Sequence, residues 1–453
     1  MLAAGIFVCA LVPLQLATAQ RAPAWNIEQF TLPNGLRVTL NADPSTSIVA
    51  ANVWYRVGSA NEVPGRTGLA HLLEHLMFAG TPNAPRGTFD ELLEDAGARS
   101  NASTTHDRTS YFEWMPSNVL PLALWLEADR MQALVGTIDS ATFHRQLDIV
   151  RNERRETVDG AIDGRGYELM LGALFPREHP YAWHPVGRSA DLDSLTLHDV
   201  REFARLYYVP ANAELVVTGS FDRDSARALV QQYFGAIAGV VSDSSVTPRT
   251  LVPARLAEHV NIVAPGDPAA PALFMGWHTV PAFSDDDAAL DIVARLLAHD
   301  ELGRLSELSG VAPRVAQAVS VAHYSARQVG FLVISIFLAP GAAPDAARRR
   351  VQREIERLAR DGPTALELRE ARGAMHVQLL DRHADVMQRA ELLNYYSFYA
   401  GGPAHAEADQ ARYASVSATD VQRVVRRYLL APHARVSIGS ADASRSNAVP
   451  VHP

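Results

Sequence analysis

The segment Gly68–Phe78 places two histidines and a glutamate on one side of an expected helix. His71 and His75 are four residues apart, so in a helix they lie one turn apart on the same face. Two neutral imidazoles in this arrangement can bind one metal ion. Glu74 lies beside them, where a carboxylate can act as a general base. The order His-x-x-Glu-His therefore predicts a metal-dependent hydrolytic centre.

The same segment has an apolar side that would anchor it in a core. Four leucines recur there at helical spacing: Leu69, Leu72, Leu73 and Leu76. Thr67 is a candidate N-cap, and Gly80 is a candidate C-terminal stop. Two histidines and a glutamate can also form an ordinary solvated face. The apolar character of this segment favours the metal site, because an exposed polar stripe is unusual in so apolar a helix.

A third metal ligand must come from another element, since catalytic sites usually have three protein ligands and one open position. Residues 140–160 predict a helix that is capped by Asp139 or Ser140. This helix contains two acids, Glu153 and Glu156, and either could be the missing ligand. The spacing alone does not choose between them.

The composition limits the class of protein. The chain has 453 residues, enough for two domains, and its contents of 48% apolar and 20% charged residues are typical of a folded globular protein. A net charge of -9 and the lack of any basic run argue against a nucleic-acid partner. After the first residues no apolar run reaches the length of a membrane span.

The first 19 residues have the pattern of a secretory signal peptide. An apolar stretch at 6–16 is followed by Ala17-Thr18-Ala19, which predicts cleavage after Ala19. The only cysteine, Cys9, lies inside this segment, so the mature chain would have neither disulfides nor thiolate ligands. We expect a periplasmic or secreted protein.

The rest of the chain consists of two similar halves. Each half opens with alternating apolar strands and a helix, and each closes with a helix, a turn and a strand; the closing segments are 199–219 and 420–439. This repeat predicts a duplicated α+β domain, with an N-terminal catalytic domain at 20–238, a linker at 239–255 and a C-terminal domain at 256–446. The second half has no counterpart of the His-x-x-Glu-His helix.

Further motifs accompany the metal helix in a fixed order. They are Ser100–Thr104, Trp125–Met131, Val150–Arg155, His179–Tyr181 and Tyr208–Asn212. Together with the helix they make the chain resemble the M16 (pitrilysin and insulinase) family of zinc metallopeptidases. The resemblance is to the short two-domain branch that includes bacterial M16B proteins and mitochondrial processing peptidase subunits, and it covers nearly the whole mature chain.

The resemblance implies a fold and a set of functional residues. The fold is α+β, with two tandem duplicated α/β-roll domains of the LuxS/MPP-like metallohydrolase type, of which only the first carries metal. The cofactor implied is zinc (Zn2+), and its ligands are His71, His75 and Glu153. Glu74 is the catalytic base. The implied activity is that of a zinc-dependent endopeptidase.

The resemblance also implies a substrate-binding strand. Its residues are Ser100, Asn101, Ala102, Ser103 and Thr104. In the family this segment is an open sheet edge, to which an extended peptide adds as a further strand. Such binding depends on conformation more than on sequence, so extended or unfolded peptides are the expected substrates.

The chain departs from the family in its second half. Active members have an arginine and a tyrosine there that contact the substrate, but in the matching segment, Ser309–Val315, neither residue stands at its expected place. Loss of one oxyanion donor typically lowers the rate by roughly 10²–10³. We therefore expect a heterodimer with a related M16 chain that supplies the arginine and tyrosine.

Three alternatives to this reading stay open. The chain can be a non-catalytic scaffold or peptide-holding subunit of this family, a different metal hydrolase that shares only the helix motif, or a pure peptide-binding module. The intact metal helix favours catalysis.

Overall fold

The computed structural model describes residues 25–239, 255–298, 303–310 and 314–439. The expected signal peptide at 1–19, almost all of the expected linker at 239–255 and the last residues of the expected C-terminal domain lie outside the described residues.

The first half contains a six-stranded mixed sheet in the order β1-β2-β6-β3-β5-β4. Its strands are β1 (Ile27–Thr31), β2 (Arg37–Ala42), β3 (Ile48–Tyr55), β4 (Arg99–Thr104), β5 (Thr109–Pro116) and β6 (Ala213–Gly219). Only β2 and β6 pair in parallel. The central strand β3 is almost wholly buried, so both faces of the sheet are covered.

The second half repeats this topology without the first strand. Its sheet has the order β7-β11-β8-β10-β9, and its one parallel pair, β11 with β7, corresponds to β6 with β2. The strands are β7 (Val260–Ala264), β8 (Ala272–Thr279), β9 (Ala316–Ser325), β10 (Gly330–Leu338) and β11 (Ala434–Ile438). The expected duplication of an α+β domain is confirmed, because the two sheets match strand for strand.

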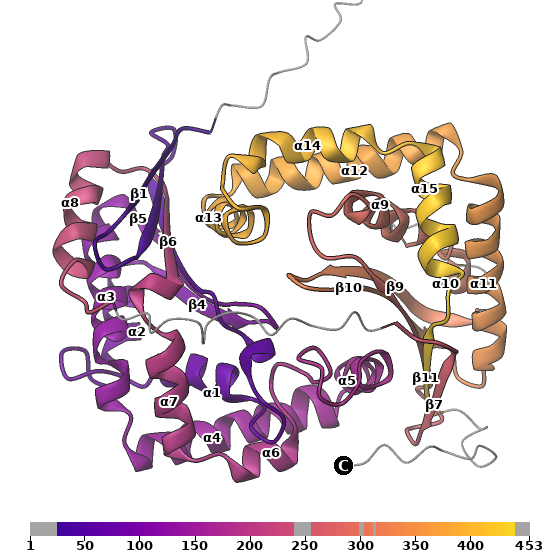
Figure 1. Cartoon of the computed structure of the whole chain (residues 1–453), viewed down its shortest axis with the longest axis horizontal. Helices are drawn as coiled ribbons and strands as arrows, with labels where there is room; N and C mark the ends of the chain where they lie inside the picture. Colours follow the sequence, from indigo (N-terminus) through magenta and orange to yellow (C-terminus); the bar gives the residue numbers. More distant parts are fainter. Residues whose placement is uncertain (1–24, 240–254, 299–302, 311–313, 440–453) are drawn as a thin grey trace, which may run out of the picture.

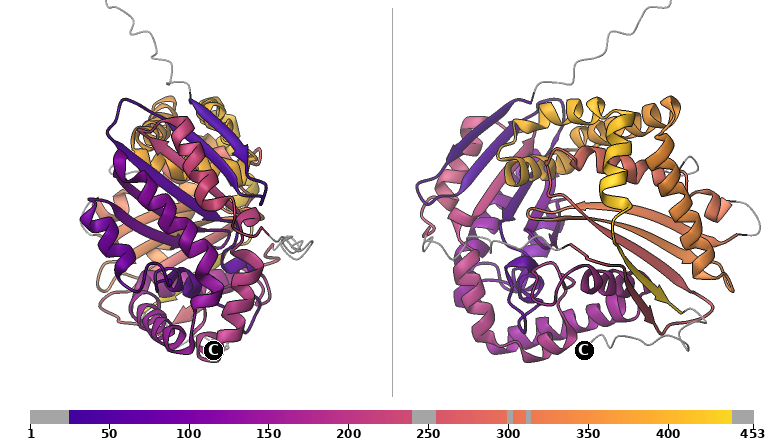
Figure 2. Two further views of the ribbon diagram at one scale, coloured as in Figure 1. Left: turned by 90° about the vertical axis from the view of Figure 1, so that its left-hand side faces the viewer. Right: turned by 45° about the vertical axis from the view of Figure 1, so that its right-hand side comes forward.

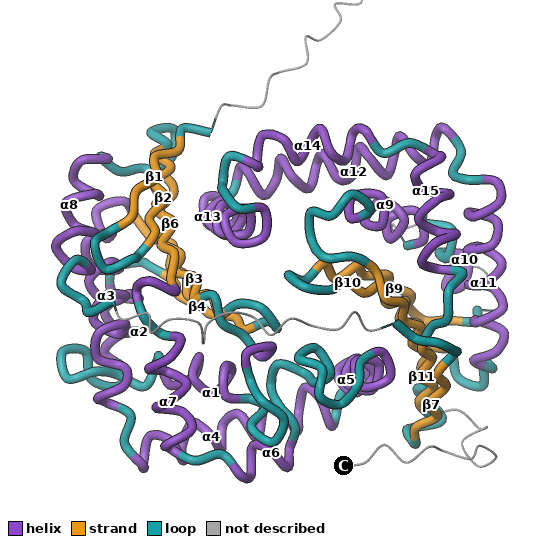
Figure 3. Tube along the Cα trace, viewed as in Figure 1, coloured by secondary structure: helices purple, strands orange, loops and turns teal. Residues whose placement is uncertain are grey.

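Most helices lie on the outer side of the two sheets (Figures 1 and 3). In the first half they are α1 (Leu69–Leu76), α2 (Thr88–Asp95), α3 (Leu120–Thr137), α4 (Ser140–Arg154), α6 (Ser189–Ser194), α7 (Leu197–Tyr207) and α8 (Arg223–Phe234). In the second half they are α9 (Asp287–Leu297), α10 (Glu307–Gly310), α11 (Pro344–Asp361), α12 (Ala365–Ala384), α14 (His405–Ser415) and α15 (Ala418–Val424). No described helix combines the length and the apolar content needed to cross a bilayer.

The two halves exchange one helix each, which the sequence did not lead us to expect. Helix α5 (Ile162–Leu174) belongs to the first half but packs on β8 and β11 of the second sheet. Helix α13 (Val386–Tyr395) belongs to the second half but packs on β3 and β6 of the first. Figures 1 and 2 show both helices between the two sheets.

The exchanged helices bury apolar side chains. Met170, Leu171 and Leu174 of α5 are fully buried in one cluster with residues of the second sheet. Gly276 of β8 lies against Met170 so closely that a Cβ there would be 2.4 Å from the sulfur. Ala390 and Leu393 of α13 pack in the same way on the first sheet. Each half thus completes the core of the other.

A buried carboxylate also joins the halves. Asp107, in the turn between β4 and β5, accepts hydrogen bonds from the hydroxyl of Tyr181, the hydroxyl of Tyr399 at 3.2 Å and the backbone N–H of Arg327 at 2.8 Å. Arg327 lies in the turn between β9 and β10. The tips of two equivalent hairpins therefore meet at one side chain.

The exchange predicts that the halves do not fold separately. We expect residues 25–239 expressed alone to expose the apolar side of α5, since each such side chain contributes about 1.5–3 kcal/mol when buried. The fragment should aggregate or bind 8-anilinonaphthalene sulfonate strongly, and co-expression with residues 255–439 should restore a soluble complex. Gel filtration and dye fluorescence check this. A monomeric fragment with cooperative unfolding would contradict it.

Candidate metal centre

The two expected histidines and one of the two expected acids lie together where α1 packs on α4. Nε2 of His71 is 3.5 Å from one carboxylate oxygen of Glu153, and Nε2 of His75 is 3.2 Å from the other. One ligand atom from each residue lies within 4.8 Å of the other two. The structure therefore brings the three residues to one point between two helices.

The three side chains fit a zinc ion. Two imidazole nitrogens and one carboxylate oxygen are a usual donor set for catalytic zinc. Donors about 2.0–2.1 Å from a tetrahedral ion lie about 3.4 Å from one another. The separations of 3.2 and 3.5 Å between the imidazoles and the carboxylate match this value.

The protonation states also suit a metal. Burial lowers the pKa of His71 to about 4, which keeps this imidazole neutral. The hydrogen bond from His75 holds the pKa of Glu153 below its ordinary value. Burial acts in the opposite direction, and the charges of the two histidines add to the lowering. Metal ligands must be neutral imidazoles and ionised carboxylates. His71 and Glu153 are thus in their metal-binding forms near neutral pH.

Glu74, the expected catalytic base, lies on α1 directly before His75 and contacts the first sheet. The hydroxyl of Thr104, the last residue of β4, donates a hydrogen bond to its carboxylate. Burial raises the pKa of Glu74, and the bond from Thr104 acts in the opposite direction. The end of β4 and the expected base therefore lie side by side.

The choice between Glu153 and Glu156 depends on where α4 changes its winding. The helix runs from Ser140 to Arg154, and its cap is Asp139, which accepts from the N–H of Thr142 at 2.7 Å. A π-helical turn, Arg155–Asp159, follows it. Glu156 lies in this turn and is exposed, outside the cluster of three.

The start of α1 differs from the expectation. The N-cap is Gly68, with φ of 93°, and the hydroxyl of Thr67 instead donates to Asp191. The acceptor for the free N–H groups is Glu62: its carboxylate accepts from the N–H of Gly68 and of Ala70, both at 2.9 Å. The helix ends at Leu76, four residues before Gly80. Thr67 and Gly80 are therefore wrong as caps.

Glu62 is a residue that the sequence analysis missed. It is almost fully buried and also accepts a hydrogen bond from the indole N–H of Trp183 at 3.0 Å. Burial raises its pKa to about 8, against the effect of the three N–H donors. A lone glutamate six residues before the N-cap of a helix gives no local signal of capping.

The expected substrate strand is an edge strand. In the sheet order β4 stands last and pairs only with β5. The five residues Ser100, Asn101, Ala102, Ser103 and Thr104 all lie in β4 and are exposed or half-buried. Their free backbone groups are therefore open to an added strand.

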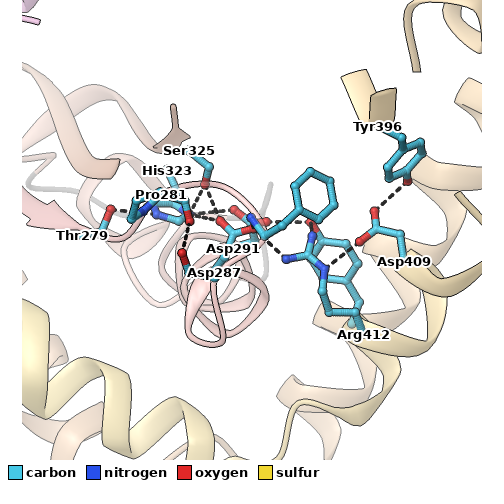
Figure 4. A network of polar contacts seen from close by, with 12 residues as sticks. Thr279, Pro281, Asp287, Asp291, His323, Ser325, Tyr396, Asp409 and Arg412 are labelled. Atoms are coloured by element: carbon cyan, nitrogen blue, oxygen red, sulfur yellow. Dashed lines mark hydrogen bonds and ion pairs between the residues drawn. The ribbon is translucent and has the colours of Figure 1, made fainter. Parts of the chain in front are cut away.

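The second half contains a similar-looking cluster that the sequence analysis also missed. Asp287 and Asp291, four residues apart on α9, lie within 4.8 Å of His323 on β9. Figure 4 shows that their polar atoms are already engaged. Asp291 contacts the histidine at 2.8 Å, and Asp287 accepts from Ser325 and from Arg412. With a guanidinium in place and the oxygens occupied, this cluster is a structural network.

The segment expected to carry the arginine and tyrosine lies partly outside the described residues, which omit 311–313. Tyr324, further along on β9, stacks on Phe331 with 4.8 Å between ring centroids.

Comparison with known proteins gives two profile matches. The profile described as Insulinase (Peptidase family M16) matches residues 37–164, and the profile described as Peptidase M16 inactive domain matches residues 194–375.

Individual proteins match over most of the chain. The chain is 32% identical over 331 residues to the zinc protease PqqE of Helicobacter pylori, covering 72% of each chain. It is 27% identical over 444 residues to an uncharacterised zinc protease of Mycobacterium tuberculosis, covering 94% of this chain and 96% of the other. The crystal structure of a protease from Helicobacter pylori superimposes with a TM-score of 0.86 at 25% identity, covering 91% of this chain and 99% of that one.

The capping role of Glu62 predicts its contribution to stability. In Glu62→Ala three buried N–H donors lose their acceptor, so we expect a loss of about 2–4 kcal/mol in the free energy of unfolding. Glu62→Gln keeps one carbonyl oxygen and should lose less. Urea unfolding of the zinc-free protein measures both. Glu178→Ala, which removes an exposed carboxylate, is the control and should change stability little. Equal stability of Glu62→Ala and this control would refute the role.

Proposed function

The chain belongs to the M16 peptidase family, and its cofactor is zinc; we propose that it is an endopeptidase whose zinc ligands are His71, His75 and Glu153. The observation that carries this proposal is the meeting of these three side chains between α1 and α4. The names of its relatives support a metallopeptidase.

The proposed mechanism assigns a separate task to each group. Bound zinc supplies a Lewis acid that makes water nucleophilic near neutral pH and polarises the peptide carbonyl. Glu74 accepts the proton of the attacking water and then delivers it to the leaving nitrogen. Thr104 orients the Glu74 carboxylate through its hydroxyl.

The substrate is an extended peptide. It adds to the free edge of β4 along Ser100–Thr104 through backbone hydrogen bonds. Because β4 ends at Thr104, beside Glu74, a peptide on this edge passes the base. Backbone pairing favours unfolded or short peptides over folded proteins.

The active form is a heterodimer, and it acts in the periplasm or outside the cell. The partner is a related M16 chain that supplies the arginine and the tyrosine, neither of which stands at its expected place in Ser309–Val315. The apolar stretch at 6–16 and the Ala17-Thr18-Ala19 site support export.

A scaffold role is the second candidate. The profile that matches the second half is described as an inactive domain, which suits a subunit that only holds peptides. The donor set between α1 and α4 favours catalysis, because a scaffold has no use for it.

Two substitutions separate metal binding from chemistry. Glu74→Gln should keep zinc at about one equivalent and lower kcat by about 10²–10⁴, because it removes the base but no ligand. Glu153→Ala should lose both zinc and activity. Metal analysis and cleavage of an unfolded peptide measure the two effects.

Glu156→Ala is the matched control, since this acid lies on the next turn and is exposed. It should keep both zinc and activity. Wild-type turnover by Glu74→Gln would refute its role, and loss of zinc in Glu156→Ala but not in Glu153→Ala would reverse the ligand assignment. A zinc-loaded protein without peptidase activity in any pairing would favour the scaffold.

The proposed heterodimer predicts a gain in activity on pairing. Addition of a related chain that carries the arginine and tyrosine should raise kcat/KM by about 10²–10³, the usual value of an oxyanion donor. Titration of the partner under peptidase assay, with light scattering to follow assembly, measures this. Full activity of the monomer alone would argue against a partner.

A further inference from the structure

The helix pair of the candidate metal centre, α1 and α4, has a counterpart in the second half. Helix α4 is capped by Asp139 and helix α12 by Thr364. Glu153 and Gln378 each lie fourteen residues after the cap of their helix. Gln378 therefore occupies the position that Glu153 has in the first half.

The helices α1 and α9 correspond in the same way. The buried triplet Leu72, Leu73 and Leu76 of α1 matches Ile292, Val293 and Leu296 of α9. This alignment places Arg295 at the position of His75. The contact between the helices is kept as well: Nη2 of Arg295 donates to Gln378 at 2.6 Å, as Nε2 of His75 contacts Glu153 at 3.2 Å. A guanidinium and an amide thus stand in place of two of the three metal donors, and the same alignment places Asp291 at the position of His71.

The cleft at this contact forms a cavity of about 610 Å³ between the two halves, which we call the second-half cavity. The first half contributes Trp54, Thr105 and Arg108, and the second contributes Arg295, Arg382 and Tyr399 among others. Thr105 directly follows Thr104, the end of the edge strand β4. This end of the edge strand β4 therefore adjoins the cavity.

Most charges that line the cavity are already neutralised. Arg108 forms an ion pair with Glu391 at 3.0 Å. Asp409 pairs with Arg412 at 2.7 Å. Asp291 is held by His323 and by the hydroxyl of Tyr413.

Two arginines in the lining are left without an acidic partner. Arg295 contacts only the neutral Gln378, and Arg382 has no ion pair or hydrogen bond among the described residues. Both are half-buried. Two guanidinium groups of the lining are thus not engaged by any carboxylate among the described residues.

We propose that the second-half cavity binds a carboxylate of the peptide substrate through Arg295 and Arg382. The carboxylate is that of the peptide's C-terminus or of an acidic side chain. A guanidinium binds a carboxylate through two parallel hydrogen bonds, and partial burial strengthens the attraction.

A metal ion does not suit this cavity. The position of His75 holds a fixed cation, and the carboxylates of the neighbouring cluster are hydrogen-bonded within the protein (Figure 4). An anion is therefore the complementary ligand. The inference rests on the proposed function only in that the anion is part of a peptide.

The test uses the zinc-loaded full chain with Glu74→Gln, so that binding is measured without cleavage. Four fluorescein-labelled peptides of one sequence vary a single residue, Asp or Asn, and the C-terminus, free acid or amide. Fluorescence anisotropy should show binding of at least one acidic form about tenfold tighter than the doubly neutral form. Arg295→Gln and Arg382→Gln should each lower this ratio severalfold, and the double variant should abolish it.

Arg353→Gln is the matched control, because Arg353 is an exposed arginine of α11 outside the cavity. It should leave the ratio unchanged, and thermal unfolding should show that all variants are folded. If Arg295→Gln does not fold, Arg382→Gln decides alone. Equal binding of the four peptides, or an equal loss in Arg353→Gln, would overturn the proposal.

The pattern of binding also identifies the source of the carboxylate. Sensitivity only to amidation assigns it to the C-terminus, and sensitivity only to Asp→Asn assigns it to a side chain. A wild-type protein that binds selectively but cleaves no peptide in any pairing would refute the peptidase and leave the carboxylate site of the cavity standing. An active peptidase that binds all four peptides equally would refute the carboxylate site and leave the peptidase standing.

Discussion

The contact of one carboxylate with two imidazoles is the constraint on which the rest of the first half depends. Glu153 lies 3.2 and 3.5 Å from two ring nitrogens, at separations that suit donors of one ion. Such a contact is costly to form in a buried place, because each polar group gives up water. The protein supports it by fixing both helices: Glu62 holds the start of α1, and the leucines of its other side lie in the core.

The second helix of the site is fixed by the exchange between halves. Arg154, next to the proposed ligand Glu153, forms an ion pair with Glu168 of α5 at 2.9 Å. Helix α5 is itself buried against the second sheet. The position of Glu153 is therefore coupled to the packing of the two halves, although no residue of the second half contributes to the cluster of three.

The sequence predicted what depends on local pattern. The period of the leucines predicted the helix α1, and the spacing of His71 and His75 predicted that both imidazoles lie on the same face of it. Spacing left Glu153 and Glu156 equal, because the π-helical turn that removes Glu156 from the face has no local signature. Capping by Glu62 and the helix exchange were missed for a related reason. Both depend on contacts between residues that lie apart in the sequence, and the apolar face of a helix can pack on either sheet.

In a duplicated protein that needs only one metal site, the equivalent cleft of the other half can carry different residues. The cleft of α1 and α4 keeps donors for a metal, whereas the cleft of α9 and α12 keeps only the contact between its helices. An arginine at the position of His75 places a permanent cation where the first half holds a metal-binding group. A guanidinium, unlike a metal ion, needs neither three ligands nor an open position. The residue that it contacts can therefore be neutral, as Gln378 is. The contact between the two helices is thereby kept, while the proposed chemistry of the cleft changes from activating water to binding an anion.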